Sequence, residues 1–460
     1  MAPKFGTSGL RGLVTELTDP LCAAYAEAFL RGADSDGTVL IGRDLRASSP
    51  RIAAAVAGGA ARAGLKAIDC GVLPTPALAL AAEVRGTAAV MVTGSHIPDD
   101  RNGLKFYTRH GEITKADETA ITNGVTSIGV NRPVDPVEMA EDVSGRAGFV
   151  ARYTEYFPED HLKGLNVGIY QHSSTARDLL PEILEALGAK TVPLGRSDRF
   201  IPVDTEALDR DTRAMLAGWA SKHGLDAIVS TDGDADRPMV ADADGNVIPG
   251  DRLGPLTAEA LGAKVVVTPV SSNTLVAHMP AFDVRLTRIG SPYVIAGMEA
   301  AEGSAVVGYE ANGGFLTGFT AKNGTRSLPP LMTRDCVLPI IAPLGLARAR
   351  GVSLAALSAS LPPRFTAADR LTEVDTTASS ALISACRDGE AKAMALFAPY
   401  GTPATINNTD GYRATFKDGL VIHLSPSGNA PECRVYIEAE DPARAQAVLA
   451  DMLGRVRAAL

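Results

Sequence analysis

Short apolar runs that stop abruptly at polar residues recur along this chain, and they predict the buried strands of an α/β protein. Residues 87–93 (TAAVMVT) are apolar and partly β-branched, which is typical of a core strand, and Ser95 follows two positions later. Similar runs at 225–230 (LDAIVS) and 306–309 (VVGY) also give way to polar or glycine-rich segments. Because open α/β sheets place ligands at the carboxyl ends of their strands, Ser95 is a candidate functional residue, although a plain surface turn is the alternative.

A weak internal repeat organises most of the chain. Residues 38–49, 166–175 and 264–273 each form an apolar run that leads into a Ser-Ser pair. A stretch of helical length follows each pair, and then comes a second short segment that ends in glycine (KAIDCG, KTVPLG and RLTRIG). Strand, polar turn, helix and strand form the βαβ pattern of a parallel sheet, so the sequence predicts three related α/β units.

The last part of the chain has a different pattern, which predicts a smaller α+β domain. After residues 360–370 we expect a helical stretch, two strands at 419–424 and 433–440, and a final helix with Asp441 as its N-cap and Pro442 at its first position. The expected domains are 1–145 with the serine loop, 146–250 with an aspartate-rich loop, 251–366 with a glycine-rich loop, and 367–460 with a serine-glycine loop.

Composition narrows the class of protein. The chain has 460 residues, 46% hydrophobic and 21% charged, as in ordinary globular proteins, and its net charge of −9 offers no basic face for nucleic acid. We expect no membrane segment, because the clean apolar runs are shorter than the roughly 18 residues of a spanning helix and no signal-like start is present. The five cysteines contain no C-x-x-C pair, which favours a reducing cytoplasm.

Three aspartates alternate directly after the second of these strands. Asp232, Asp234 and Asp236 would repel one another strongly unless a cation lay among them, and Mg²⁺ is the hard divalent ion that leaves a position for a phosphate oxygen. An EF-hand also starts with D-x-D-x-D, but its sixth position is Arg237 here instead of glycine and its twelfth is Ala243 instead of glutamate. A solvated acidic turn is the remaining alternative.

The glycine-rich loop after the third strand holds Glu310 and Asn312, whose carboxylate and amide can bond neighbouring sugar hydroxyls. Such loops are mostly structural, so this signal is weak by itself. Ser95 lacks the flanking glycines of a hydrolase G-x-S-x-G elbow, since Thr93 and Ile97 occupy those positions. The common glycine-rich nucleotide-binding loops are also missing from the sequence.

A fourth loop, near the C-terminus, has the composition of a phosphate site. Ser427, Gly428 and Asn429 offer backbone N–H groups and short donors in a tight turn, and Arg434 follows closely. A concave nest of such donors beside a guanidinium suits a phosphate group.

Five motifs then occur in a familiar order: TSGLRG, TGSHIP followed by NGLK, DGDADR, GYEANGG and PSGNAPECR. In this order the chain resembles the α-D-phosphohexomutase superfamily, which contains phosphomannomutases, phosphoglucomutases and phosphoglucosamine mutases. The match extends from residue 6 to about residue 438, nearly the whole chain. The resemblance implies four domains, three of them related α/β units and the last one α+β.

The resemblance also implies roles for individual residues, with Ser95 as the serine that carries a phosphoryl group. The positions that match the catalytic centre, including a lysine thought to assist proton transfer, are Ser95, Lys105, His96, Arg11 and Arg237. The positions that match the magnesium site are Ser95, Asp232, Asp234 and Asp236. The positions that match the sugar-binding and phosphate-binding loops are Glu310, Asn312, Ser427, Gly428, Asn429 and Arg434.

The implied reaction moves a phosphoryl group between O6 and O1 of a hexose phosphate through phosphoserine and a hexose 1,6-bisphosphate. We expect mannose 6-phosphate and mannose 1-phosphate as the pair. A phosphoglucomutase or a dual mannose/glucose enzyme is the alternative, a phosphoglucosamine mutase is a more distant one, and an inactive sugar-phosphate-binding protein is the alternative of another class. We expect the protein to be a monomer or a homodimer, with a small-molecule hexose phosphate as its partner.

One loop departs from the family pattern. Ser425 stands where the family commonly has arginine, and Asn429 and Ala430 stand where it has Thr-Glu. A serine cannot replace a cationic fork, so Arg434 is expected to be the main cation on the distal phosphate. His423 is expected to assist it as a pH-sensitive donor.

Overall fold

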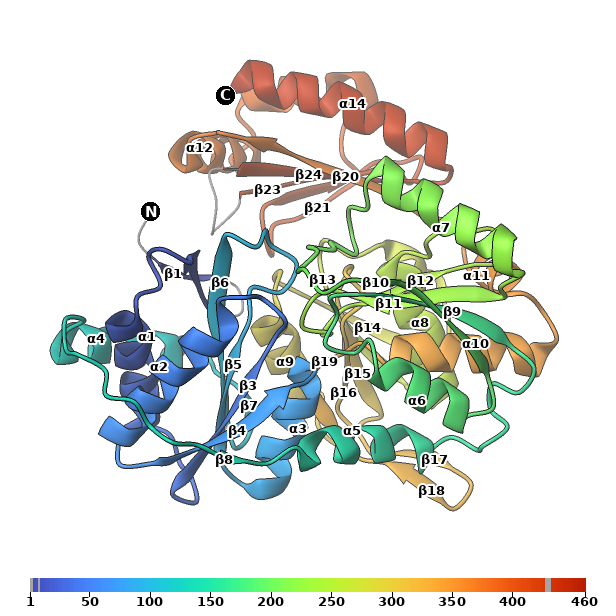
Figure 1. Cartoon of the computed structure of the whole chain (residues 1–460). Coiled ribbons are helices and arrows are strands. Elements are labelled where there is room, and N and C mark those ends of the chain that lie inside the picture. Colours follow the sequence, from blue (N-terminus) through green and yellow to red (C-terminus); the bar gives the residue numbers. More distant parts are fainter. Residues whose placement is uncertain (1–2, 7–8, 427–431) are drawn as a thin grey trace.

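The computed structural model describes residues 3–6, 9–426 and 432–460. Three α/β units form the body of the molecule, and a C-terminal unit lies across their upper side in the view of Figure 1. This arrangement confirms the expected fold class, three related α/β domains followed by a smaller α+β domain. The boundaries drawn between the domains from the sequence stay a prediction.

The first unit is a mixed sheet with helices packed on its faces. Its strands are β1 (Lys4–Gly6), β2 (Gly9–Leu13), β3 (Thr38–Arg43), β4 (Lys66–Val72), β5 (Ala88–Val92), β6 (Arg101–Thr108), β7 (Gly111–Glu112) and β8 (Ala140–Glu141). Its helices are α1 (Asp19–Leu30), α2 (Ser49–Arg62), α3 (Thr75–Arg85) and α4 (Lys115–Ile128). Helices α2 and α4 both pack against α1, whereas α3 contacts the next unit.

The second unit is smaller, and the third adds a hairpin and two C-terminal helices. The second contains α5 (Ser144–Thr154), β9 (Asn166–His172), α6 (Leu179–Ala186), β10 (Lys190–Arg196), α7 (Arg210–His223), β11 (Ala227–Thr231) and β12 (Pro238–Ala241). The third contains α8 (Gly250–Leu261), β13 (Val265–Pro269), η1 (Thr274–His278), β14 (Asp283–Thr287), α9 (Ser291–Glu299), β15 (Val306–Tyr309), β16 (Phe315–Thr317), β17 (Ala321–Asn323), β18 (Arg326–Leu328), β19 (Leu331–Asp335), α10 (Leu338–Arg350) and α11 (Leu354–Ala359).

The three units share one strand order, which explains the repeat in the sequence. The neighbouring strands run β4-β3-β5-β6 in the first unit, β10-β9-β11-β12 in the second and β14-β13-β15-β16 in the third. In each unit the first three strands of this set are parallel and the fourth is antiparallel. The loop after β5 therefore corresponds to the loops after β11 and β15.

The third unit differs from the expected pattern at its first crossover. The sequence predicts a helix of ordinary length after 264–273, but the structure has only the short 3₁₀ helix η1, capped by the side chain of Asn273. The helix stops at Met279, which is extended (φ −99°, ψ 107°) and precedes Pro280. A residue before proline is pushed out of the α region, so no α-helix continues there.

The C-terminal unit is an antiparallel sheet covered by helices. It contains β20 (Phe365–Thr372), α12 (Thr376–Arg387), α13 (Ala391–Met394), η2 (Ala395–Tyr400), β21 (Thr405–Asn407), β22 (Tyr412–Thr415), β23 (Val421–Pro426), β24 (Glu432–Ala439) and α14 (Pro442–Ala459). The expected cap of the last helix is confirmed, since the Asp441 side chain accepts from Arg444 N at 2.8 Å. Strand β20 is not among the two strands expected in this unit, and its signal is weak because most of its side chains are exposed.

The hydrophobic cores separate the C-terminal unit from the rest. One core runs continuously through the first three units, whereas the core of the last unit contains only residues from 367 onwards. The last unit can therefore keep its own packing if it moves relative to the other three. Within the described ranges, no helix is long and apolar enough to cross a membrane.

Candidate active site

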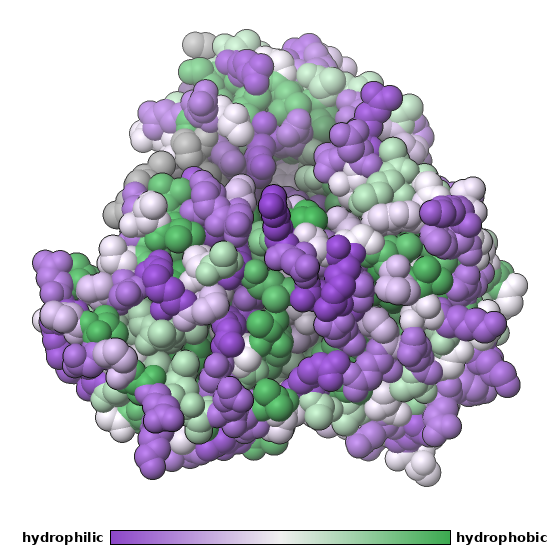
Figure 2. Space-filling view, viewed as in Figure 1, coloured by the Kyte–Doolittle hydropathy of each residue, from purple (hydrophilic) through white to green (hydrophobic). Residues whose placement is uncertain are grey.

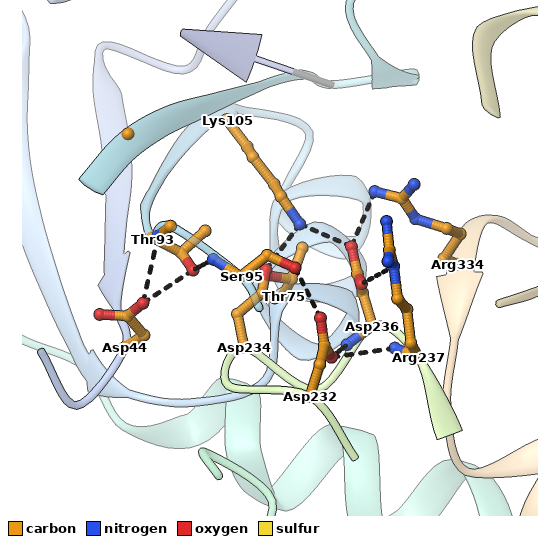
Figure 3. A network of polar contacts seen from close by, with 12 residues as sticks. Asp44, Thr75, Thr93, Ser95, Lys105, Asp232, Asp234, Asp236, Arg237 and Arg334 are labelled. Atoms are coloured by element: carbon orange, nitrogen blue, oxygen red, sulfur yellow. Dashed lines mark hydrogen bonds and ion pairs between the residues drawn. The ribbon is translucent and has the colours of Figure 1, made fainter. Parts of the chain in front are cut away.

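The corresponding loops of the first two units meet at a hydrogen bond between Ser95 and Asp232 (Figure 3). Ser95 Oγ donates to Asp232 Oδ2 over 2.6 Å and lies 3.3 Å from Nδ1 of His96. Ser95 is buried and has a positive φ of 54°, a conformation that costs free energy for a residue with a Cβ. Its N–H donates to Thr93 Oγ1 at 2.8 Å, which helps to hold the turn.

The three aspartates form a compact buried cluster. Ligand oxygens of Asp232, Asp234 and Asp236 all lie within 4.8 Å of one another. Burial, reinforced by the charges of Asp236 and Asp234, raises the pKa of Asp232 well above its ordinary value. Among the described residues, Asp234 Oδ1 and Asp236 Oδ1 have no hydrogen-bond partner. Buried carboxylate oxygens that lack donors fit a hard divalent cation, so this donor set suits one.

Two cations already lie against this cluster. The Lys105 ammonium donates to Asp234 Oδ2 at 2.6 Å and to Asp236 Oδ2 at 2.5 Å, and Arg334 Nη2 donates to the same Asp236 oxygen at 2.7 Å. Burial works against the charge on Lys105, but Asp234 and Asp236 outweigh it and raise its pKa. Burial likewise opposes ionisation of Asp236, yet Arg334 and Lys105 hold its pKa below the usual range.

Two more arginines and a neutral histidine complete the centre. Arg11, on β2 opposite Gly103, has a pKa lowered to about 10 by burial and then by the charge of Arg237. The same burial, with Arg237 and Arg11 close by, lowers the pKa of His96 far below its ordinary value, so the imidazole is neutral at physiological pH. Arg237 Nη1 lies 3.8 Å from Glu206 Oε2. The centre therefore combines several fixed cations with the aspartates, as an anionic substrate requires.

The glycine-rich loop of the third unit joins the same network. Glu310 is buried after β15, and its Oε2 accepts from Arg334 Nη1 at 3.2 Å. Arg334 thus links the glycine-rich loop to Asp236 of the aspartate loop. Asn312 is also buried, and its Oδ1 accepts from Gly314 N at 2.9 Å, so this amide helps to shape the loop that carries Glu310.

The predicted phosphate loop lies only partly within the described residues. Ser427, Gly428 and Asn429 fall outside them. Arg434 lies on β24 directly opposite Ser425 of β23, and its side chain is 35% exposed, so its guanidinium is accessible to a ligand.

The expectation that His423 acts as a pH-sensitive phosphate donor is wrong. Its ring is buried, bonds the Asp410 carbonyl oxygen through Nε2 at 2.6 Å and stacks on Tyr436. Burial lowers the pKa of His423 to about 4, so the imidazole stays neutral at physiological pH. The neutral imidazole therefore offers no positive charge to a bound phosphate.

Sequence reasoning missed several residues of the network, among them Arg334, Thr75 and Arg46. Arg334 stands at the end of β19, and Thr75, whose Oγ1 donates to Asp234 Oδ2 at 2.5 Å, begins α3. Arg46 lies between β3 and α2, beside one of the Ser-Ser pairs. Arg334 and Arg46 share one signal in the sequence. Each stands in or next to an Arg/Asp pair at the end of an apolar run, at 332–335 (MTRD) and 42–46 (GRDLR).

The surface is hollowed below the C-terminal unit, and hydrophilic residues gather beside the hollow on this face (Figure 2).

All five cysteines lie among the described residues, where they are buried and unpaired.

Family models match nearly the entire chain. Models described as phosphoglucomutase/phosphomannomutase alpha/beta/alpha domains I, II and III match residues 2–131, 148–245 and 249–365, and the model of the C-terminal domain matches 376–455.

Curated relatives extend over the same length. A phosphomannomutase of Sinorhizobium fredii is 47% identical over 466 residues, covering 98% of each chain, and one of Salmonella muenchen is 41% identical, covering 99% of this chain and 96% of that one. A phosphoglucosamine mutase of Thermobifida fusca is 30% identical, covering 99% and 98%.

Solved structures share the fold. A phosphoglucomutase/phosphomannomutase family protein of Burkholderia thailandensis superposes with a TM-score of 0.78 at 20% identity, covering 98% of this chain and 97% of that one. A phosphoglucomutase of Paramecium in its open form gives a TM-score of 0.70 at 16% identity, with 99% and 94% covered.

Proposed function

The chain belongs to the phosphoglucomutase/phosphomannomutase family, and on that premise we propose that it is a magnesium-dependent phosphomannomutase that interconverts mannose 6-phosphate and mannose 1-phosphate. The observation that carries this proposal is the contact of the Ser95 hydroxyl with the buried aspartate cluster. The choice of mannose rests on the relatives at 47% and 41% identity, both phosphomannomutases, against 30% for a phosphoglucosamine mutase.

In this proposal phospho-Ser95 transfers its phosphoryl group to the free hydroxyl of the bound hexose phosphate. The bond from phosphorus to Ser95 Oγ breaks as the bond to the sugar oxygen forms, and a hexose 1,6-bisphosphate results. When bound, Mg²⁺ supplies positive charge to the phosphoryl oxygens. Arg11 and Arg237 orient the transferring group. The proton of the attacking hydroxyl ends on the leaving Ser95 Oγ, and Lys105 is our candidate for relaying it, since its ammonium can give one proton as it receives another.

The second half-reaction needs the bisphosphate to turn around in the site, so that its other phosphate faces Ser95. Glu310 then bonds the sugar hydroxyls in both orientations. Arg434, with the loop of Ser427, Gly428 and Asn429, holds whichever phosphate is not reacting. The separate core of the C-terminal unit supports a role in which this unit closes over the sugar and excludes water, which would otherwise hydrolyse phosphoserine.

The test is a parallel assay of purified protein on mannose, glucose and glucosamine 1-phosphates, with Mg²⁺ and the matching bisphosphate activator. We expect the highest kcat/KM on mannose 1-phosphate and a phosphoryl group on Ser95 by mass spectrometry. An equal or higher value on glucose 1-phosphate would indicate a phosphoglucomutase or a dual enzyme. No turnover of any of the three, with Ser95 unmodified, would indicate a sugar-phosphate-binding protein.

We also propose that the enzyme works in the cytoplasm as a monomer or homodimer. The five buried, unpaired cysteines support the reducing compartment.

A further inference from the structure

A fully buried arginine lies beneath the serine loop. The Arg46 guanidinium donates to the backbone carbonyl oxygens of Ser95 at 3.0 Å, Ile97 at 2.6 Å, Pro98 at 2.8 Å and Arg101 at 3.1 Å. One side chain thus accounts for four acceptors of a loop that has little regular structure. The carbonyl of the strained Ser95 is one of them, so Arg46 helps to hold the conformation that aims the serine hydroxyl.

Asp44 fixes the arginine and the start of the same loop. Its carboxylate accepts from Arg46 Nε at 3.1 Å, from Thr93 Oγ1 at 2.8 Å and from Gly94 N at 3.3 Å. Gly94 is also required for space, because a Cβ at this position would lie 2.7 Å from Arg46 Cζ. The serine loop therefore closes around a buried Asp44–Arg46 pair.

The second unit contributes an aromatic ring to this arrangement. Phe200, between β10 and α7, places its ring centroid 3.8 Å from Arg46 Cζ. The ring also lies against Gly233 of the aspartate loop, where an added Cβ would come within 2.9 Å of ring carbons and 2.8 Å of the Ser95 carbonyl oxygen. Phe200 therefore lies between the guanidinium that holds the serine loop and the loop that holds the aspartates.

We propose that Arg46 and Phe200 are positioning residues that set the separation between Ser95 and the aspartate cluster, an inference that rests on the proposed phosphoryl transfer. The serine and the aspartates come from different domains, so no single element fixes the 2.6 Å contact between Ser95 and Asp232. The stacked guanidinium and ring act as a rigid spacer between the two loops. Phosphoryl transfer depends on such spacing, because a misplacement of about 1 Å can cost about a hundredfold in rate.

The chemistry of both residues suits a spacer. A planar guanidinium can bond several carbonyls at its edge while its face stacks on a ring, and lysine cannot do both. Leucine in place of Phe200 would keep the site apolar but remove the flat surface. Arg46→Lys and Phe200→Leu are therefore the informative variants. Phe282→Leu is the matched control, since Phe282 is half-buried against the core just before β14, a strand that carries none of the site residues.

The experiment measures kcat and KM for mannose 1-phosphate, Mg²⁺ affinity of the dephosphorylated protein by calorimetry, and thermal unfolding. In Phe200→Leu we expect kcat to fall by about tenfold to a hundredfold with little change in KM for the sugar, together with weaker Mg²⁺ binding. The control Phe282→Leu should keep the wild-type kcat and the wild-type Mg²⁺ affinity. The double variant with Arg46→Lys should lose less than the sum of the two single losses in free energy, since both act through one contact.

Normal kcat and Mg²⁺ affinity in Phe200→Leu would overturn the spacer, as would losses no larger than those of the control at equal thermal stability. If Arg46→Lys does not fold, Phe200→Leu decides the matter alone. If the wild-type protein turns over no hexose phosphate, the proposed function fails, while the Mg²⁺ affinities still report whether Phe200 positions the aspartate loop.

Discussion

The Ser95 hydroxyl donates a 2.6 Å hydrogen bond to Asp232 Oδ2, although the two residues are 137 positions apart and belong to different α/β units. The two residues lie on corresponding loops because the units share one strand order, and the packing of the first unit against the second brings these loops together. A phosphoryl group on Ser95 would lie beside the aspartate cluster.

Ser95→Ala should abolish mutase turnover and leave the fold intact, because it removes the oxygen that we propose as the carrier of the phosphoryl group. Activity is measured with the bisphosphate activator supplied, and the fold by circular dichroism and thermal unfolding. Ser379→Ala is the control, since Ser379 is equally buried but bonds only its own helix α12. Near-normal rates in Ser95→Ala would show that Ser95 is not the covalent carrier.

Asp234→Asn should weaken Mg²⁺ binding and lower turnover together, because one of three carboxylates is lost. A magnesium titration of the rate, with calorimetry on the same protein, measures both. Thr75→Val is the comparison, because it removes a donor to Asp234 and keeps the carboxylate, so its effect should be smaller. An unchanged titration curve in Asp234→Asn would contradict the metal site.

Glu310→Gln should impair every hexose phosphate that the enzyme accepts. The change keeps the shape of the side chain but removes the charge that bonds Arg334 and that we propose to bond sugar hydroxyls. Charge-assisted bonds of this kind contribute about 1.5–3 kcal/mol each. The measurement is kcat/KM on the three sugar 1-phosphates. Unchanged values on all of them would exclude Glu310 from sugar recognition.

Arg434→Ala should raise KM for hexose phosphate strongly, because the guanidinium is the expected cation for the distal phosphate. Ser425→Arg should lower KM or leave it unchanged, since Ser425 lies opposite Arg434 on the neighbouring strand and its side chain points to the same face. Both variants are assayed at two pH values. A normal KM in Arg434→Ala would assign the phosphate to other residues.

His423→Gln should reduce the acid sensitivity of folding without changing the pH dependence of KM. The pKa of His423 falls from its ordinary 6.5 to about 4 in the folded protein because the ring is buried. Between these two pH values the unfolded chain therefore binds a proton that the native chain does not. Above about pH 6.5 this difference costs no stability, and by pH 4 it lowers the free energy of unfolding by about 3 kcal/mol.

Urea unfolding at pH 7.5 and pH 5 measures this effect. The wild-type protein should lose more free energy of unfolding between the two pH values than His423→Gln does, and other histidines contribute equally to both proteins. Equal losses would mean that His423 is already protonated in the native state.

Much of the fold and part of the site followed from the sequence because their signals are local. Apolar runs such as 87–93 must be buried, and the change to polar residues at Ser95 and Asp232 marks where a strand leaves the core. The Asp441 cap depends only on residues of its own helix turn. The repeat pattern predicted an ordinary helix at the first crossover of the third unit. The structure has only the short 3₁₀ helix η1 there, because the proline that follows it stops the helix.

The tertiary structure decided which distant side chains meet. Arg334 bridges Asp236 and Glu310, and Arg46 stacks on Phe200, only because separate sheets bring their loops together. His423 shows the converse, since its position in the sequence indicated a phosphate donor, whereas burial of its ring keeps it neutral. Charge state and contact distance depend on the surrounding atoms, and those come mostly from other units of the chain, so local sequence did not determine them.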